Sequence, residues 1–142
     1  RECHPQAHAQ WAGSNHSHAL ENLIKYGRPI AELPQKDGNP RKIGRQFDPE
    51  CAKCHVTGFA YQSGYIDEVQ TPHLGGNGCE NCHGPGSLHA GQPNNPAFRK
   101  SLRLSMDDKD RVGQMCMKCH DLDNDPHFHI DKWEKIKHGR EK

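Results

Sequence analysis

Three copies of one short motif, C-x-x-C-H, constrain the fold of this chain more than any other feature. They span residues 51–55, 79–83 and 116–120. The motif is typical of covalent c-type haem attachment, in which two thiols add to the haem vinyl groups and the next His becomes the proximal iron ligand. The predicted thioether residues are Cys51, Cys54, Cys79, Cys82, Cys116 and Cys119, and the predicted proximal ligands are His55, His83 and His120.

Paired cysteines also bind zinc or form disulfides, and both alternatives fit this sequence less well. The 24 residues between Cys54 and Cys79 exceed the roughly 15–20 expected between the pairs of a zinc ribbon. His follows every pair although only 12 of the 142 residues are His, which chance would give in roughly 0.06% of cases. Disulfides are disfavoured because the cysteine count of seven is odd and the paired residues are too close together to form a framework.

Cys3 and His4 match the end of one further copy of the motif, which comes first in the chain. In chain order, the complete copies at 51–55, 79–83 and 116–120 are therefore the second, third and fourth motifs. A complete copy needs another Cys immediately before Arg1, and that residue would also account for the odd cysteine count. The alternatives are a haem held by one thioether bond and an ordinary surface Cys. We predict that Cys3 is a thioether residue and His4 a proximal ligand, so that four haem c groups are expected.

The composition indicates that something other than side chains fills the centre of the fold. Only 32% of the residues are apolar, 6% are aromatic, and the mean hydropathy is −1.05. Such a chain buries too little apolar surface to offset the conformational entropy lost on folding. The formal charge of +1 argues against a basic nucleic-acid footprint, and the propionates of four haems would bring it to roughly −7. No run approaches the roughly 18 apolar residues of a membrane span, and no signal peptide is recognisable, which predicts a mature or shortened chain.

Between the motifs the sequence predicts short helices joined by loops rich in Pro and Gly. Leu20, Leu23 and Ile24 recur at helical spacing and predict a helix that ends before Pro29. Residues 29–47 are then expected to form a long surface loop.

Two helix starts and one strand candidate follow. Asp48 and Pro49 predict the start of the helix that carries the second motif, with Asp48 as its cap. The run 105–108 resembles a capping box that opens the helix carrying the fourth motif. Residues 56–70 are the strand candidate, as a hairpin turning near residues 63–64.

These elements predict a mainly α fold with long loops and at most a short β-hairpin. Glycines 75, 76 and 78 are expected to let the backbone approach closely before the third motif, and a last helix is expected over residues 131–138. We predict one tetrahaem domain over residues 1–142, with haems as its core.

Eight further histidines are available as sixth ligands of the haem irons. The methionines lie in or beside one helix and are expected to pack there, so bis-His ligation is predicted, with lower potentials than His/Met ligation would give. The eight are His8, His16, His18, His73, His89, His127, His129 and His138.

Several stretches together resemble a known family. They are Cys3-His4 with Trp11, Ser14 and His16, then 54–56, 58–59, 64–65, the run Gly-Cys-Glu-Asn-Cys-His-Gly-Pro-Gly at 78–86, and the fourth motif. They are similar to the tetrahaem cytochromes c that accept electrons from hydroxylamine oxidoreductase in ammonia-oxidising bacteria, and to their multihaem relatives. The resemblance covers most of the chain and implies haems packed in close pairs that form one conduit.

The resemblance also implies distal ligands. His16 matches the distal ligand opposite His83, His89 the one opposite His4, and His138 the one opposite His120. The family member that accepts electrons from hydroxylamine oxidoreductase has no distal protein ligand at its second haem. Here His73 is expected to close that site, opposite His55, with His8 and a water as the competing sixth ligands. No haem of the chain is left for His18, His127 and His129. These residues are expected to contact propionates or solvent, and the alternative is that one of them reaches a haem in a neighbouring molecule.

Three functions compete at this point. The leading hypothesis is an electron carrier or conduit between redox protein partners, in which Trp11 and Trp133 pack against porphyrin. The second is an enzyme acting on a small nitrogen compound at one five-coordinate haem, and the third is a subunit of an extracellular haem filament. C-type haem is attached outside the cytoplasm, so a periplasmic or extracellular location is expected.

Overall fold

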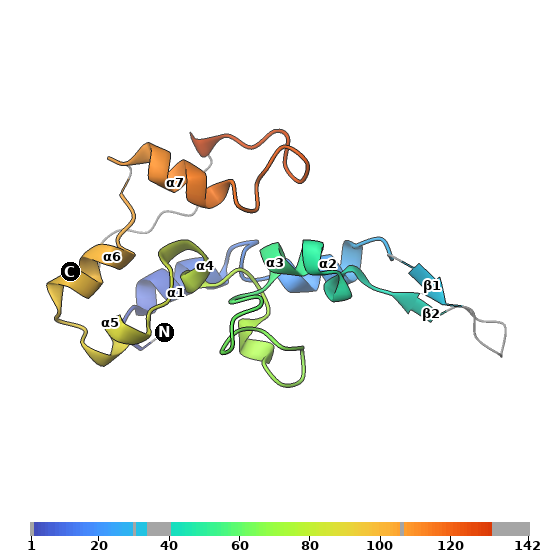
Figure 1. Cartoon of the computed structure of the whole chain (residues 1–142), viewed down its shortest axis with the longest axis horizontal. Helices are drawn as coiled ribbons and strands as arrows, with labels where there is room; N and C mark the ends of the chain where they lie inside the picture. Colours follow the sequence, from blue (N-terminus) through green and yellow to red (C-terminus); the bar gives the residue numbers. More distant parts are fainter. Residues whose placement is uncertain (1, 30, 34–40, 106, 132–142) are drawn as a thin grey trace. The chain divides into compact units, whose positions relative to one another are not determined.

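A computed structural model of the chain describes residues 2–29, 31–33, 41–105 and 107–131. The chain divides into two compact units, Arg1–Gly78 and Cys79–Lys142. The predicted mainly helical class is confirmed (Figure 1). The first unit contains α1 (Pro5–Ala12), α2 (Ala19–Tyr26), β1 (Ala31–Leu33), β2 (Arg41–Ile43), the 3-10 helix η1 (Arg45–Phe47), α3 (Pro49–His55) and the 3-10 helix η2 (Pro72–Leu74). The second unit contains α4 (Cys79–His83), α5 (Ser87–Gly91), α6 (Pro96–Leu102) and α7 (Lys109–Cys116).

The helix predicted from Leu20, Leu23 and Ile24 is α2. Leu20 and Leu23 are buried, whereas Ile24 is 39% exposed at the edge of the apolar face. The helix ends at Tyr26, and Gly27 is its C-cap, with its N–H donating to Leu23 O. The buried face of α2 packs against α3 and η1, so the helix carrying the second motif rests on α2 (Figure 1).

The predicted cap of α3 is confirmed, and that of α7 is wrong by three residues. The Asp48 carboxylate accepts a hydrogen bond from Glu50 N, which satisfies an N–H that has no partner inside the helix. In α7 the cap is Asp108, whose carboxylate accepts from Arg111 N. Ser105 instead bonds to Asp107 in the preceding turn, which it can do because a short hydroxyl side chain reaches nearby backbone and side-chain groups.

The strand prediction for residues 56–70 is also wrong, because this segment is a series of turns. Gly58 and Ala60 have φ values of +69° and +65°, in the left-handed region that breaks a strand. The segment folds back so tightly that a Cβ on Gly64 would lie 1.6 Å from Gly58 O. The strand-like feature that remains is one isolated antiparallel bridge between Val56 and Gly75.

A short antiparallel hairpin does occur, but inside the segment predicted as a surface loop. Strands β1 and β2 pair Ala31 with Ile43, Glu32 with Lys42 and Leu33 with Arg41. With three residues in each strand, the hairpin gave no alternation long enough to be recognised in the sequence.

The predicted close approach of the glycines before the third motif is confirmed. Gly76 has a φ of +110°, and a Cβ there would lie 2.5 Å from Ser17 O. A Cβ on Gly78 would lie 2.5 Å from the Thr57 hydroxyl, which donates to Gly76 O and accepts from Gly78 N. The loop before the third motif is therefore held against both the start of α2 and the turn after α3.

Few apolar side chains are buried in the part of the chain that the structure describes. Those below a tenth exposure are Leu20, Leu23, Ala52, Val56 and Val112. Large apolar side chains stay exposed in both units, among them Tyr61, Val69, Leu88 and Leu122. The polypeptide alone therefore supplies only a small core, as its composition predicts.

Candidate haem-binding sites

The second motif lies on α3, where helical geometry brings its three functional residues together. Cys51, Cys54 and His55 are all half-buried. The Nδ1 atom of His55 lies 2.7 Å from Ala19 O, at the start of α2. Because a carbonyl oxygen only accepts hydrogen bonds, Nδ1 must carry the proton, and the neutral ring then has its lone pair on Nε2. This is the tautomer that binds iron through Nε2.

The third motif is the whole of α4, and its His is held in the same way. His83 Nδ1 lies 2.7 Å from Leu102 O, the last residue of α6. The chain turns directly after the His at Gly84, whose φ is +83°. Glu80 Oε1 accepts from Gly86 N at 2.7 Å, which closes the Gly-Pro-Gly turn onto the motif.

The fourth motif begins at the end of α7 and continues as a turn. Cys119 N and His120 N both donate to Cys116 O, at 3.2 and 3.0 Å. Here the His120 Nδ1 partner is a carboxylate, Asp125 Oδ2, at 2.9 Å. The Phe128 ring stacks on the imidazole, with ring centroids 4.7 Å apart and planes 20° apart. In each of the three complete motifs, the His predicted as the proximal ligand is thus oriented through its Nδ1 atom.

All seven cysteines are free of disulfide bonds. Burial, together with smaller contributions from the neighbouring thiols of Cys116 and Cys79, raises the pKa of the Cys82 thiol to about 11. Burial likewise raises the pKa of Cys116. Catalytic and redox cysteines have a lowered pKa, because the thiolate is the reactive form, so these two thiols do not resemble such sites.

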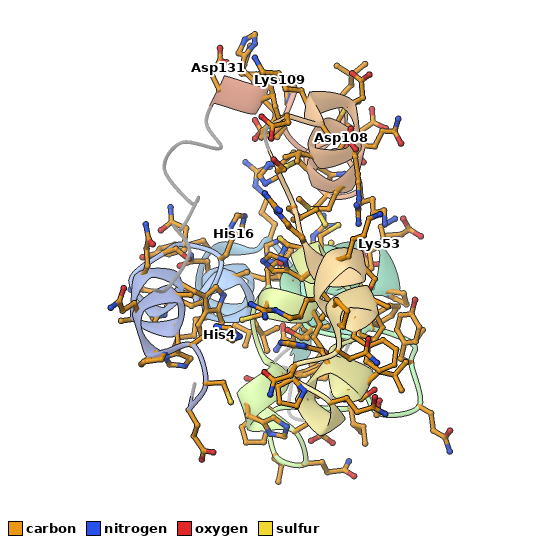
Figure 2. The ribbon with its side chains drawn as sticks, turned by 90° about the vertical axis from the view of Figure 1, so that its left-hand side faces the viewer. His4, His16, Lys53, Asp108, Lys109 and Asp131 are labelled. Carbon is orange, nitrogen blue, oxygen red and sulfur yellow. The ribbon has the colours of Figure 1, made fainter. Side chains whose placement is uncertain are left out.

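The first candidate site lies at the start of α1. Cys3 and His4 are exposed just before the helix, and His16 follows it (Figure 2). The segment after α1 is fastened to the loop before the third motif by two hydrogen bonds. Asn77 N donates to His16 O at 2.7 Å, and Trp11 Nε1 donates to Asn77 O at 2.8 Å. Trp11 therefore positions the backbone next to His16, whether or not it also packs on porphyrin.

The other predicted distal ligands lie in both units. His73 is exposed on η2, and His89 is half-buried on α5. Two of the predicted ligand pairs combine a residue of the first unit with a residue of the second. These pairs are His16 with His83 and His4 with His89, and both stay predictions. His138, Trp133 and the helix expected over 131–138 lie outside the described residues, apart from Asp131.

The remaining histidines are His8, His18, His127 and His129. His8 is half-buried, with its ring centroid 5.5 Å from that of Trp11. His18 is exposed, and its Nδ1 lies 2.9 Å from a Glu21 carboxylate oxygen. His127 and His129 are exposed near Phe128 in the sequence.

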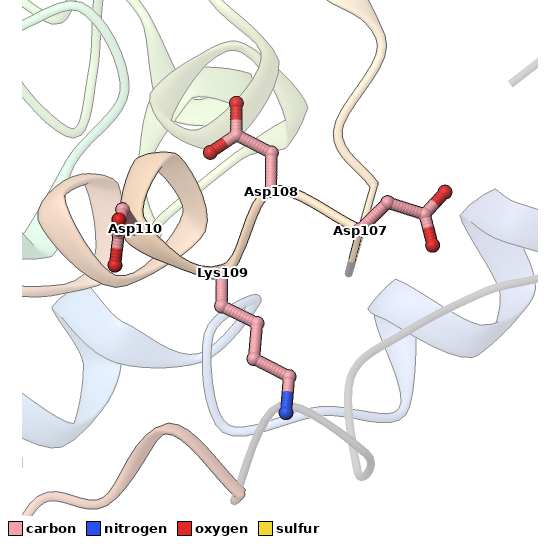
Figure 3. Close-up of a pocket in the computed structure, with 4 residues that line it drawn as sticks. All are labelled: Asp107, Asp108, Lys109 and Asp110. Carbon is pink, nitrogen blue, oxygen red and sulfur yellow. The ribbon is translucent and has the colours of Figure 1, made fainter.

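No three Cys, His, Asp or Glu side chains converge on a common metal position within residues 2–29, 31–33, 41–105 and 107–131. A hollow lined by Asp107, Asp108, Lys109 and Asp110 opens at the start of α7, away from the motif at its other end (Figure 3). Asp108 caps the helix there, so at least part of this acidic cluster has a structural role.

The residues present fit c-type haem. Pairs of thiols that form no disulfide precede three histidines whose Nδ1 partners leave the lone pair on Nε2, and large apolar side chains are exposed. These features define a chain that binds several haems covalently. The family model "Cytochrome c554 and c-prime" matches residues 1–84, and the chain belongs to this family. The resemblance found in the sequence is thereby confirmed, and the chain is a c-type haem protein of this family.

Two comparisons give the extent of the similarity. The chain is 35% identical over 127 residues to cytochrome c-554 of Nitrosomonas europaea, covering 83% of this chain and 53% of that protein. The chain therefore spans about half the length of this curated relative. A solved structure of reduced cytochrome c554 from the same organism matches 94% of this chain and 77% of its own, with a TM-score of 0.58 and 27% identity.

The groups that orient the predicted proximal histidines could not be found from the sequence. Two of them, Ala19 O and Leu102 O, are backbone carbonyls, which no residue pattern reveals. Asp125 and Phe128 are side chains, but they follow the fourth motif in a turn without a recognised signature.

None of the helices that the structure describes is both long and apolar enough to cross a lipid bilayer.

Proposed function

We propose that this protein is an electron carrier or conduit with four covalently bound, mostly bis-His c-type haems. The observation that supports this most directly is the shared arrangement of His55, His83 and His120, each with Nδ1 bonded to a carbonyl or carboxylate oxygen. Second-sphere partners of this kind fix the tautomer and the orientation of metal-bound histidines. Cys3 and His4 are proposed as the residues of the remaining site.

Bound c-type haem supplies reversible one-electron chemistry at its iron. The residues of the chain attach and orient it. The thiols at 51, 54, 79, 82, 116 and 119, with Cys3, would hold the rings covalently, and His4 with the three oriented histidines would fill one axial position of each iron. Since both α3 and α4 are fixed by hydrogen bonds to neighbouring helices, the ligands are placed rigidly, which favours transfer without rearrangement.

The opposite axial positions are assigned to His16, His89, His138 and His73. Bis-His ligation at all four would leave no iron open to a substrate, so we propose a carrier and not an enzyme. The assignment of His73 decides this point, because the second site is where the resembled family member has an open iron. In the first unit His73 is exposed on η2, where Pro72 starts the turn and Thr71 precedes it.

Low-temperature EPR of the oxidised protein tests this assignment. We expect all iron to be low-spin, and we expect His73→Ala to convert about a quarter of it to high-spin by opening one of four sites. His18→Ala is the matched control, because His18 is also exposed in the first unit but bonds to Glu21, and it should leave the spectrum unchanged. A high-spin quarter in the unaltered protein would instead favour the alternative, an enzyme of nitrogen-oxide or hydroxylamine chemistry at one five-coordinate haem.

Redox proteins are the proposed donor and acceptor, and the proposed location is periplasmic or extracellular because c-type haem is attached outside the cytoplasm. Residues 1–142 are proposed to act as one tetrahaem domain. Self-association into a haem nanowire is a further hypothesis, which electron microscopy at high protein concentration tests. Filaments would support it, and a monodisperse monomer would exclude it.

A further inference from the structure

The Nδ1 partner of His120 differs in charge from those of the other oriented histidines. His55 and His83 each donate to a neutral backbone carbonyl at 2.7 Å, whereas His120 donates to the Asp125 carboxylate at 2.9 Å. Hydrogen bonds to ionised acceptors are roughly twice as strong as those between neutral groups. The proximal ligand of the fourth motif therefore has a partner of a different kind.

The turn after the motif holds this carboxylate in place. Asp121 accepts hydrogen bonds from Asp123 N and Asn124 N, and its carbonyl accepts from Asp125 N at 2.8 Å. Phe128 N then donates to Asp125 O at 2.9 Å, and the Phe128 ring stacks on the imidazole. The ring of His120 is thus held at its edge by Asp125 and on its face by Phe128.

A carboxylate on Nδ1 makes the imidazole a more basic ligand, because negative charge is drawn toward the ring. A more basic ligand stabilises the ferric state over the ferrous state, since the ferric ion carries one more positive charge. His120 and Asp125 side chains are each only about one-third exposed, so water screens this effect incompletely.

We propose that Asp125 is a positioning residue that lowers the reduction potential of the haem attached at Cys116 and Cys119. This proposal rests on the proposed function, because it requires His120 to be an iron ligand. The reaction concerned is addition of one electron to ferric iron, supplied by a redox partner in the cell or by a chemical reductant in the test. Asp125 would thereby make this haem harder to reduce than it is with a neutral Nδ1 partner.

Asp125→Asn tests the proposal, because it keeps the size of the side chain and an acceptor oxygen while removing the charge. In an EPR-monitored redox titration of the holoprotein, we expect the ferric-to-ferrous ratio of this haem to fall about tenfold at a fixed potential, equivalent to about 59 mV. The matched control is Asp123→Asn, which removes the same charge from an exposed residue of the same turn. It should change the ratio by less than about twofold, because exposed charges are screened.

A change below twofold in Asp125→Asn, or one equal to that in Asp123→Asn, would overturn the proposal. Should Asp125→Asn yield no holoprotein, Asp125→Ser also removes the charge and must shift the ratio in the same direction. Failure of the underlying function has a separate signature. If His120 is not a ligand, the unaltered protein will already lack a low-spin signal from this haem, whereas a full low-spin set with an unmoved potential rejects only the role of Asp125.

Discussion

Produced without haem attachment, the chain is expected to lack a stable fold. Its buried apolar side chains in the described residues are Leu20, Leu23, Ala52, Val56 and Val112, while other large ones such as Tyr61 and Leu122 remain exposed. So small a core cannot offset the conformational entropy of ordering the chain, and the missing apolar contacts must come from the haems.

Far-UV circular dichroism during heating measures this effect. The chain made in cells without c-type haem maturation should have little helical signal and no cooperative transition, whereas the haem-loaded chain from the same sequence should melt cooperatively. A cooperative transition of similar midpoint in both forms would show that the polypeptide folds alone, and the haem-filled core would then be wrong.

Replacing both Cys51 and Cys54 with Ser should remove one haem and destabilise the first unit. These thiols lie on α3, which contacts α2 and is joined to it by the hydrogen bond between His55 Nδ1 and Ala19 O. Loss of a haem removes more buried apolar surface than truncation of an aromatic side chain, so we expect a loss of at least about 3–5 kcal/mol in the free energy of unfolding.

The control lies within the same motif. Lys53 occupies a variable position between the two cysteines and forms an exposed ion pair with Glu50, so Lys53→Ser should keep every haem and change stability by less than about 1 kcal/mol. Haem content per chain is measured from the absorbance of the pyridine complex, and stability from denaturant unfolding. A double Ser variant with the full haem content would exclude attachment at this motif.

The sequence was sufficient wherever a feature depends on residues close together in the chain. The C-x-x-C-H motifs, the apolar face of α2 and the Asp48 cap are all of this kind, and the helical fold class followed from them. The family resemblance rested on the same local runs and was confirmed.

Predictions of secondary structure failed where the local sequence is compatible with more than one structure. Ser105 and Asp108 are both good helix caps, and the helix starts after the second because Asp108 reaches Arg111 N. Residues 56–70 contain strand-forming side chains, but the close contact between Gly58 and Gly64 closes the segment into turns. The β1–β2 hairpin is too short to produce a recognisable pattern.

The orientation of the predicted proximal histidines depends on contacts between residues distant in sequence, and no local pattern encodes these contacts. Ala19 lies 36 residues from His55, and Leu102 lies 19 residues from His83. Asp125 is only five residues from His120, yet its role appears only when the turn built on Asp121 is known. Each contact fixes which ring nitrogen carries the proton, and the motif alone does not determine this.

The most direct test of the account is the intact mass of the denatured protein, since thioether-bound haem remains on the chain when the fold is lost. If four haems are bound covalently, the measured mass should exceed that of the bare 16.0 kDa polypeptide by the mass of four haems. A mass equal to that of the bare polypeptide would contradict covalent haem at Cys51, Cys54 and their counterparts, and with it the proposed path for electrons.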